Sequence, residues 1–154
     1  MGDQRVRTAC RWLIVAVLTV TLMGCQLSRK AEAGPVEFPL GQEFTLSGGQ
    51  EATISGENLR LRFTDVVEDS RCPTEVECFW TGQARIAVAV EPAGRAATSA
   101  EFNTNPAPGQ NVQTVEVDGY TVELKSLDPY PRTPDDGIAL EDYTAILLVR
   151  KPAG

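Results

Sequence analysis

The sequence predicts an all-β fold: an antiparallel β-sandwich of eight or nine short strands, Ig-like or similar, with a closed barrel as the second choice. Three observations indicate this class. Apolar and polar residues alternate in several short segments, turns rich in Gly, Pro, Asn and Asp separate those segments, and no stretch after residue 24 keeps helical periodicity for ten residues. Residues 36–152 are expected to form a single β-domain with one core.

Three strands are expected where apolar side chains occupy every second position, at residues 43–46, 59–63 and 85–90. Each segment has one apolar face and one polar or small face, as a strand has when only one side lies on the core. Turns are expected where Gly, Pro and Asn interrupt the alternation, at residues 48–49, 55–58 and 91–94.

A β-hairpin is the clearest local signal. Residues 112–117 and 120–124 flank Asp118-Gly119, a pair that readily adopts the positive φ angles of a type I′ turn. Further on, residues 145–149 read Ala-Ile-Leu-Leu-Val and are apolar at every position. That run predicts a central strand covered on both faces, which closes the domain.

The first 24 residues are typical of a secretory signal. Arg residues precede an apolar run from Trp12 to Met23, and Leu22-Met23-Gly24-Cys25 is the pattern that lipoprotein signal peptidase reads. We expect a signal peptide at residues 1–24, a lipidated tether at 25–35 and acylation of Cys25. A membrane-spanning helix is disfavoured because it needs roughly 20 apolar residues. Ordinary cleavage after Ala33 is also disfavoured, because a polar stretch would separate it from the apolar run.

The expected location is the bacterial cell envelope. Gln26, rather than Asp, follows the cysteine, and by resemblance to Gram-negative lipoproteins this implies the outer membrane, on its periplasmic side, if the cell has one. Removing the leader takes three of the 14 basic and one of the 21 acidic residues, which leaves a net charge of −9. This charge argues against nucleic acid and anionic lipid as partners, so the lipid anchor must hold the protein at the membrane.

Two cysteines remain in the domain, Cys72 and Cys78, and thiols pair in an oxidising compartment, so a disulfide is expected. The alternative, a redox-active pair, uses two intervening residues, whereas five intervene here. The chain has no His, and both methionines, Met1 and Met23, lie in the leader. Ser-His-Asp and Cys-His catalysis and His-ligated metal sites are therefore excluded in cis, and we expect no cofactor and no metal.

The cysteines lie in the first of two unusual loops, residues 68–82. Thr74 and Glu75 are expected to be exposed there as candidate binding residues. For Phe79 and Trp80 two interpretations stay open. They could form a recognition surface on a stapled loop that is ordered before binding, or they could turn inward and cap the core, and the inward orientation is the one we favour for Trp80.

The second loop, residues 128–137, has three prolines in ten residues and cannot be a strand. Its prolines stiffen it toward polyproline geometry, so that Tyr130 and Arg132 project as candidate binding residues. Asp135 and Asp136 invite a calcium interpretation, extended by Glu141-Asp142. The spaced oxygens of a calcium loop are missing, however, and a solvated turn is favoured.

Several motifs lie in and beside these loops: Asp69-Ser-Arg-Cys-Pro73, then Cys78, Trp80 and Gly82, then Leu127-x-Pro-Tyr-Pro131 with Glu141-Asp-Tyr143. Together they resemble a family of uncharacterised small bacterial secreted proteins and lipoproteins with a Ser-Arg-Cys-Pro and Cys-x-Trp signature. The resemblance covers nearly the whole domain. It implies that the two loops are the family's marked features, but it implies no activity, substrate or catalytic residue.

These observations favour a non-catalytic envelope lipoprotein whose β-domain binds another envelope protein or a cell-wall polymer through the two loops. An enzyme is not expected. The alternative of a different class is a hydrolase of envelope polymers that uses two carboxylates, as glycosidases do. Its candidate pairs are Glu75 with Glu77 and Asp136 with Glu141. A protease inhibitor that uses the stapled loop is a further variant of the binding hypothesis.

Overall fold

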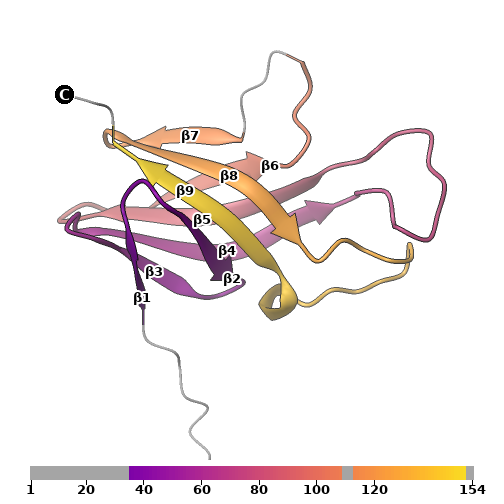
Figure 1. Ribbon diagram of the computed structural model, residues 1–154, viewed down its shortest axis with the longest axis horizontal. Coiled ribbons are helices and arrows are strands. Elements are labelled where there is room, and N and C mark those ends of the chain that lie inside the picture. Colours follow the sequence, from indigo (N-terminus) through magenta and orange to yellow (C-terminus); the bar gives the residue numbers. More distant parts are fainter. Residues whose placement is uncertain (1–34, 109–112, 152–154) are drawn as a thin grey trace, which may run out of the picture. The chain divides into compact units, whose positions relative to one another are not determined.

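The computed structural model describes residues 35–108 and 113–151, so the predicted signal peptide, Cys25 and nearly all of the tether lie outside the described residues. Two sheets pack face to face as a β-sandwich, and they do not close into a barrel (Figure 1). The five-stranded sheet has the order β1 (Val36–Pro39), β3 (Glu51–Ser55), β4 (Leu59–Asp69), β5 (Ala84–Pro92), β6 (Thr98–Asn103). The four-stranded sheet has the order β2 (Glu43–Ser47), β9 (Thr144–Arg150), β8 (Tyr120–Asp128), β7 (Thr114–Val117). The predicted all-β sandwich is thereby confirmed.

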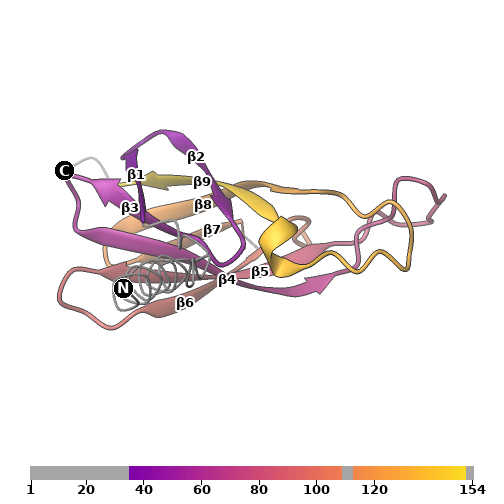
Figure 2. The ribbon, with the colours of Figure 1, turned by 90° about the horizontal axis from the view of Figure 1, so that it is seen from below.

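The core lies between the two layers, which are seen edge-on in Figure 2, with β4, β5 and β6 in one layer and β8 and β9 in the other. It is filled by the alternate residues that the periodicity predicted. In β4 these are Leu59, Leu61 and Phe63, all fully buried, and β5 alternates between buried and half-buried residues along its whole length. Period-two patterning is sufficient here because a strand turns successive side chains to opposite faces.

The predicted hairpin is confirmed. β7 and β8 pair with Val117 opposite Tyr120, and the two residues between them, Asp118 and Gly119, have φ angles of 53° and 80°. Two positive φ angles in succession define the type I′ turn, whose twist matches that of the flanking strands.

The strand at residues 144–150, β9, is central in its sheet, as predicted, and lies between β2 and β8. Ala145, Leu147 and Val149 belong to the core. Among the described residues no third layer covers the outward face, but Leu148 is buried there between its register neighbours Glu43 and Glu123. The apolar run therefore identified the strand's central place correctly, and the cover on its second face comes from neighbouring strands of the same sheet.

One pairing departs from the antiparallel expectation. β1 runs parallel to β3, with Val36 opposite Ala52, while all other strand pairs are antiparallel. A tight turn at residues 40–42 separates β1 from β2, yet the two strands lie in different sheets. The chain therefore passes from one sheet to the other between β1 and β2. Which sheet a strand joins depends on which sheet edge is open to pairing, and the local sequence does not indicate this.

Two long strands position the loops. β4 has 11 residues, with bulges between Phe63 and Asp65 and between Val66 and Glu68, and it pairs with β5 as far as Asp69. The segment that joins β4 to β5 projects from the end of the sandwich, beside the segment between β8 and the short 3₁₀ helix η1 (Leu140–Asp142) (Figure 1). Bulges increase strand twist and bend the strand, which suits arms that extend past a sheet's edge.

Candidate functional site

Two segments form one structure at this end of the sandwich: the stapled loop, residues 70–83, and the proline loop, residues 129–139. We call them together the loop pair. The backbone N–H of Thr74 donates to the carbonyl of Pro131 at 3.0 Å, and that of Glu75 donates to the carbonyl of Arg132 at 3.0 Å. The Glu75 carboxylate also accepts bonds from Arg132 Nε at 3.0 Å and Nη2 at 2.6 Å. Sequence analysis marked both loops but did not bring them together.

Arg71 holds the base of the loop pair. Its side chain is 2 % exposed, and it forms a bidentate pair with Asp69, Nε to Oδ1 at 2.8 Å and Nη2 to Oδ2 at 2.6 Å. Nη1 donates to the carbonyl of Leu127 at 2.6 Å, and Nη2 donates to the carbonyl of Pro129 at 2.7 Å. One guanidinium therefore joins the end of β4 to the end of β8 and the start of the proline loop.

Two tyrosines complete this arrangement: Tyr143 joins Asp69 and Arg71 in what we call the buried cluster, and the exposed Tyr130 covers it. The Tyr143 hydroxyl donates to Asp69 Oδ2 at 3.0 Å, and the Tyr130 ring stacks on the Arg71 guanidinium, 4.3 Å from its carbon to the ring centroid. Sequence analysis missed Asp69, Arg71 and Tyr143 as a site, although all three belong to the motifs quoted above. The sequence places Asp69 and Arg71 next to Cys72, but it does not show that they are buried, because the groups that bond to them lie far away along the chain.

Burial, hydrogen bonds and charge together shift the pKa values of Asp69 and Tyr143. Burial opposes ionisation of Asp69, but the hydrogen bonds and charge of Arg71 and the Tyr143 hydroxyl outweigh it, so the pKa of Asp69 is lowered. Burial, followed by the hydrogen bond to the Asp69 carboxylate, raises the pKa of Tyr143 from 10.0 to about 12. Asp69 is thus a carboxylate and Tyr143 a neutral phenol at neutral pH.

Tyr143 is therefore expected to ionise only when the pH approaches 12. The folded protein holds its proton more tightly than the unfolded chain, so its contribution to stability is complete below pH 10 and is lost as the pH rises to about 12. Two pH units correspond to about 2–3 kcal/mol. A phenolate absorbance titration should show a late step that Tyr143→Phe removes. If Tyr143→Phe removes no absorbance step near pH 12, the raised pKa of Tyr143 is contradicted.

The predicted disulfide between Cys72 and Cys78 is confirmed, with Cα atoms 6.0 Å apart. The arms of the stapled loop are also joined by backbone bonds: the Ser70 N–H donates to the carbonyl of Gln83 at 2.8 Å, and the Cys72 N–H to that of Thr81 at 2.9 Å. Together with the contacts to the proline loop, these bonds give the segment a defined conformation before any partner binds.

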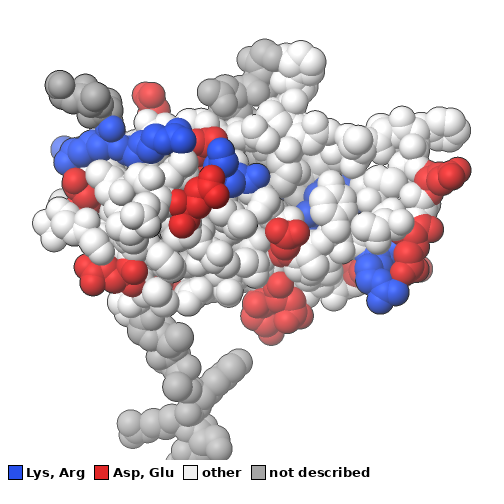
Figure 3. Space-filling model, viewed as in Figure 1, with Lys and Arg blue, Asp and Glu red and all other residues white. Residues whose placement is uncertain are grey.

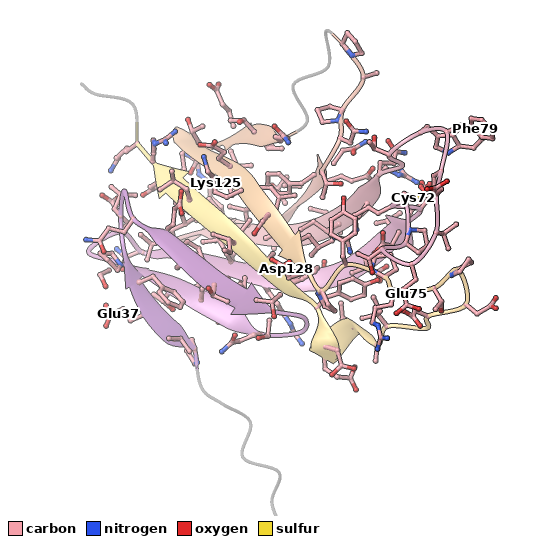
Figure 4. All side chains as sticks on the ribbon, turned by 45° about the vertical axis from the view of Figure 1, so that its right-hand side comes forward. Glu37, Cys72, Glu75, Phe79, Lys125 and Asp128 are labelled. Carbon is pink, nitrogen blue, oxygen red and sulfur yellow. A yellow bond between two sulfur atoms is a disulfide. The ribbon has the colours of Figure 1, made fainter. Side chains whose placement is uncertain are left out.

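The inward orientation that we favoured for Trp80 is wrong. Phe79 is 102 % exposed and Trp80 is 75 % exposed, and Phe79 points away from the sandwich at the outer end of the loop (Figure 4). The physical reason is that β4 and β5 carry the loop past the end of the core, while the buried cluster fills the space beneath it. We call Phe79 and Trp80 the aromatic tip.

The other predicted residues lie on the surface of the loop pair. Thr74 and Glu75 are exposed, as expected, and so is the Arg132 side chain, which is paired with Glu75. Tyr130 is 48 % exposed although one face of its ring covers Arg71. The structure thus brings together all five candidate binding residues, Thr74, Glu75, Trp80, Tyr130 and Arg132, in the loop pair.

Asp136 organises the proline loop from within. Its carboxylate accepts bonds from the N–H groups of Arg132 at 2.6 Å and Thr133 at 3.0 Å and from the Thr133 hydroxyl at 2.9 Å. These bonds lower the pKa of Asp136, and the two from backbone N–H groups have the largest effect. The carboxylate thereby closes a turn, because it bonds the N–H groups three and four positions before it. Within residues 35–108 and 113–151, no group of three or more acidic or Cys side chains could hold a metal ion.

The surface around the aromatic tip is mainly acidic. Glu75, Glu77 and Asp135 are exposed on the loop pair, with Arg132 among them. Figure 3 shows acidic side chains and one small basic area at this end of the sandwich. The aromatic tip is therefore an apolar projection on a loop pair whose exposed charged side chains are mainly acidic.

Comparisons with protein-family models, curated proteins and solved structures found no match to this chain. Among the described residues, no helix has the length and apolar character needed to cross a membrane.

Proposed function

We propose that this protein is a lipid-anchored protein of the bacterial cell envelope and that its β-sandwich is a non-catalytic binding module. The loop pair is the proposed binding surface, and the partner is another envelope protein or a cell-wall polymer. The observation that carries the proposal is the aromatic tip, where two large side chains are exposed on a loop held by a disulfide and by backbone hydrogen bonds.

Exposed Phe and Trp at a projecting point favour binding over a purely structural role. Large aromatic side chains supply most of the free energy at many protein interfaces, and they lose little conformational entropy when they bind. Here the loop is already ordered by its contacts with the proline loop. The acidic surround suits a partner with an apolar pocket and basic groups at its rim.

The anchor and the location in this proposal rest on the sequence. The basic and apolar leader, followed by Leu22-Met23-Gly24-Cys25, supports cleavage before Cys25 and acylation of its thiol. The net charge of −9 that follows from this cleavage supports attachment through lipid rather than through electrostatic contact with the membrane.

The hydrolase alternative has less support from the geometry. Glu75 is paired with Arg132, and Asp136 closes a turn with a lowered pKa, whereas a general acid of a glycosidase needs a raised one. The inhibitor variant is also weakened, because the N–H groups of Thr74 and Glu75 are bonded to the proline loop and cannot pair with the backbone of a protease.

Removing the aromatic tip should abolish binding without affecting the fold. In Phe79→Ser and Trp80→Ser the lost side chains are exposed, so we expect the melting temperature to change by no more than about 2 °C. A photo-crosslinker placed at Thr74 in cells should form one dominant adduct in the parent chain and lose it in both variants.

The matched control is Val67→Ser, which removes an exposed apolar side chain from β4 instead of the tip. It should leave the adduct unchanged. If the tip variants keep the adduct, or if Val67→Ser removes it equally well, then the loop pair is not the binding surface.

A further inference from the structure

We propose that a groove beside Tyr130 is a separate binding site and that it takes an uncharged saccharide. The groove has a volume of about 380 Å³ and opens between β8 and the loop pair. The proposed saccharide site lies on the Tyr130 side of the loop pair. Its ligand differs from the partner that we propose for the aromatic tip. The inference rests on the part of the proposed function that makes the loop pair a binding surface, and it is independent of the lipid anchor.

The lining of the groove is amphipathic. Leu124 and Leu127, which belong to the core, form its apolar part. Most of the other lining residues carry hydroxyl or amide groups, among them Thr81, Asn105 and Gln113. Sites for small molecules commonly combine an apolar surface with a few polar groups that set orientation. A sugar ring has matching chemistry, because its C–H faces are apolar and its edge carries hydroxyl groups.

Tyr130 supplies an aromatic surface in a set orientation. One face of its ring lies on the Arg71 guanidinium, at 4.3 Å, and the residue is still 48 % exposed. A ligand in the groove would therefore meet the ring's other face or its edge. The face of an aromatic ring carries negative potential and attracts the weakly positive C–H groups of a sugar.

The charges in the groove decide between a neutral and an anionic ligand. Arg71 uses four of its five N–H groups on Asp69, Leu127 and Pro129. Lys125 is held by Glu123, with Nζ to Oε1 at 2.8 Å. Both cations of the groove therefore have acidic partners within the protein, and an anion would gain little there.

Asp128 points to the same conclusion. It lines the groove and is exposed, and within the described part of the chain it receives only a long bond of 3.4 Å, from the Ser126 hydroxyl to Oδ2. Figure 4 shows Asp128 and Lys125 at separate points along β8. A carboxylate repels anions but accepts hydrogen bonds from hydroxyl groups, and these charge-assisted bonds are the stronger kind. The groove thus offers an aromatic face, an apolar floor and a hydroxyl acceptor.

The test uses the full chain, purified in detergent, and isothermal titration calorimetry. The probes are neutral tetramers of glucose, galactose, mannose and N-acetylglucosamine, with tetragalacturonate as the anionic probe. We expect at least one neutral tetramer to bind with Kd below about 1 mM. Tyr130→Ala should weaken that binding by about tenfold, and Asp128→Ala by about fivefold.

Matched variants separate the contributions of the Tyr130 ring and the Asp128 carboxylate to saccharide binding. Tyr130→Phe keeps the ring and should stay within twofold of the parent chain, as should Asp65→Ala, which removes an exposed carboxylate on β4. Phe79→Ser should also leave saccharide binding unchanged, since Phe79 does not line the groove. Loss of the crosslinked adduct in Phe79→Ser with intact saccharide binding would support two separate sites.

The inference is overturned if no neutral tetramer binds at about 10 mM, or if only tetragalacturonate binds. It is also overturned if binding persists unchanged in both Tyr130→Ala and Asp128→Ala. Because Asp128 is exposed, its variant keeps the test decisive even if Tyr130→Ala is unstable. None of these results depends on whether the aromatic tip has a partner, so failure here would leave that part of the proposed function standing.

Discussion

Arg71→Met is expected to lower the free energy of unfolding by about 3–5 kcal/mol, which is the usual cost of removing one partner of a buried ion pair. Asp69 would keep its charge with a side chain that is only 10 % exposed. The carbonyls of Leu127 and Pro129 would lose their donor. Urea denaturation followed by circular dichroism measures this loss directly.

The matched control is Arg60→Met. Arg60 also pairs with glutamates, Glu51 and Glu91, but its side chain is 51 % exposed, so we expect a much smaller loss than in Arg71→Met. The double variant Asp69→Leu/Arg71→Met removes both buried charges and should recover part of the stability. Equal losses in Arg71→Met and Arg60→Met would mean that the buried cluster is not what holds the loop pair to the sandwich.

Gly82→Ala is expected to cost at least about 3 kcal/mol, by a different mechanism. Gly82 has a φ of 67°, and a Cβ atom there would overlap the carbonyl oxygen and carbon of Ser70. Both atoms belong to the backbone, so the arms of the stapled loop would have to separate. That movement would break the bonds that join Ser70 to Gln83 and Cys72 to Thr81.

Gly94→Ala isolates the steric contribution. Gly94 has nearly the same backbone conformation, with a φ of 72°, but no atom lies within 4 Å of an added Cβ. Only the left-handed conformation opposes this substitution, at about 1 kcal/mol. The free energies of unfolding of the two variants, measured by urea denaturation, should differ by about 2 kcal/mol or more. If Gly82→Ala costs no more than Gly94→Ala, the arms are not in close contact.

Much of the fold could be predicted because its signals are local. The alternation in residues 59–63 and 85–90 selected the buried faces of β4 and β5, and Asp118-Gly119 identified the hairpin turn. The parallel pairing of β1 with β3 had no such signal. Strand pairing between distant segments depends on which sheet edge is open, and that is a property of the assembled sheets.

The candidate site was predicted in parts. Thr74, Glu75, Tyr130 and Arg132 were marked because Cys and Pro residues make their loops unusual, and the structure places them together. The orientation of Trp80 was mistaken because an aromatic residue near a strand end is more often buried. Its exposure follows from the length of the β4 and β5 arms, which neither residue type nor periodicity reveals.

The amino-acid sequence was sufficient to define the class of fold, the turn of the hairpin and the Cys72–Cys78 disulfide. These depend on residue type and on spacing over a few positions. The buried cluster, the joining of the loop pair and the groove beside Tyr130 were decided only in the tertiary structure. They form between groups far apart along the chain, such as Arg71 and the carbonyl of Leu127, 56 positions away, and burial gives a charged residue its role only once both partners are in place.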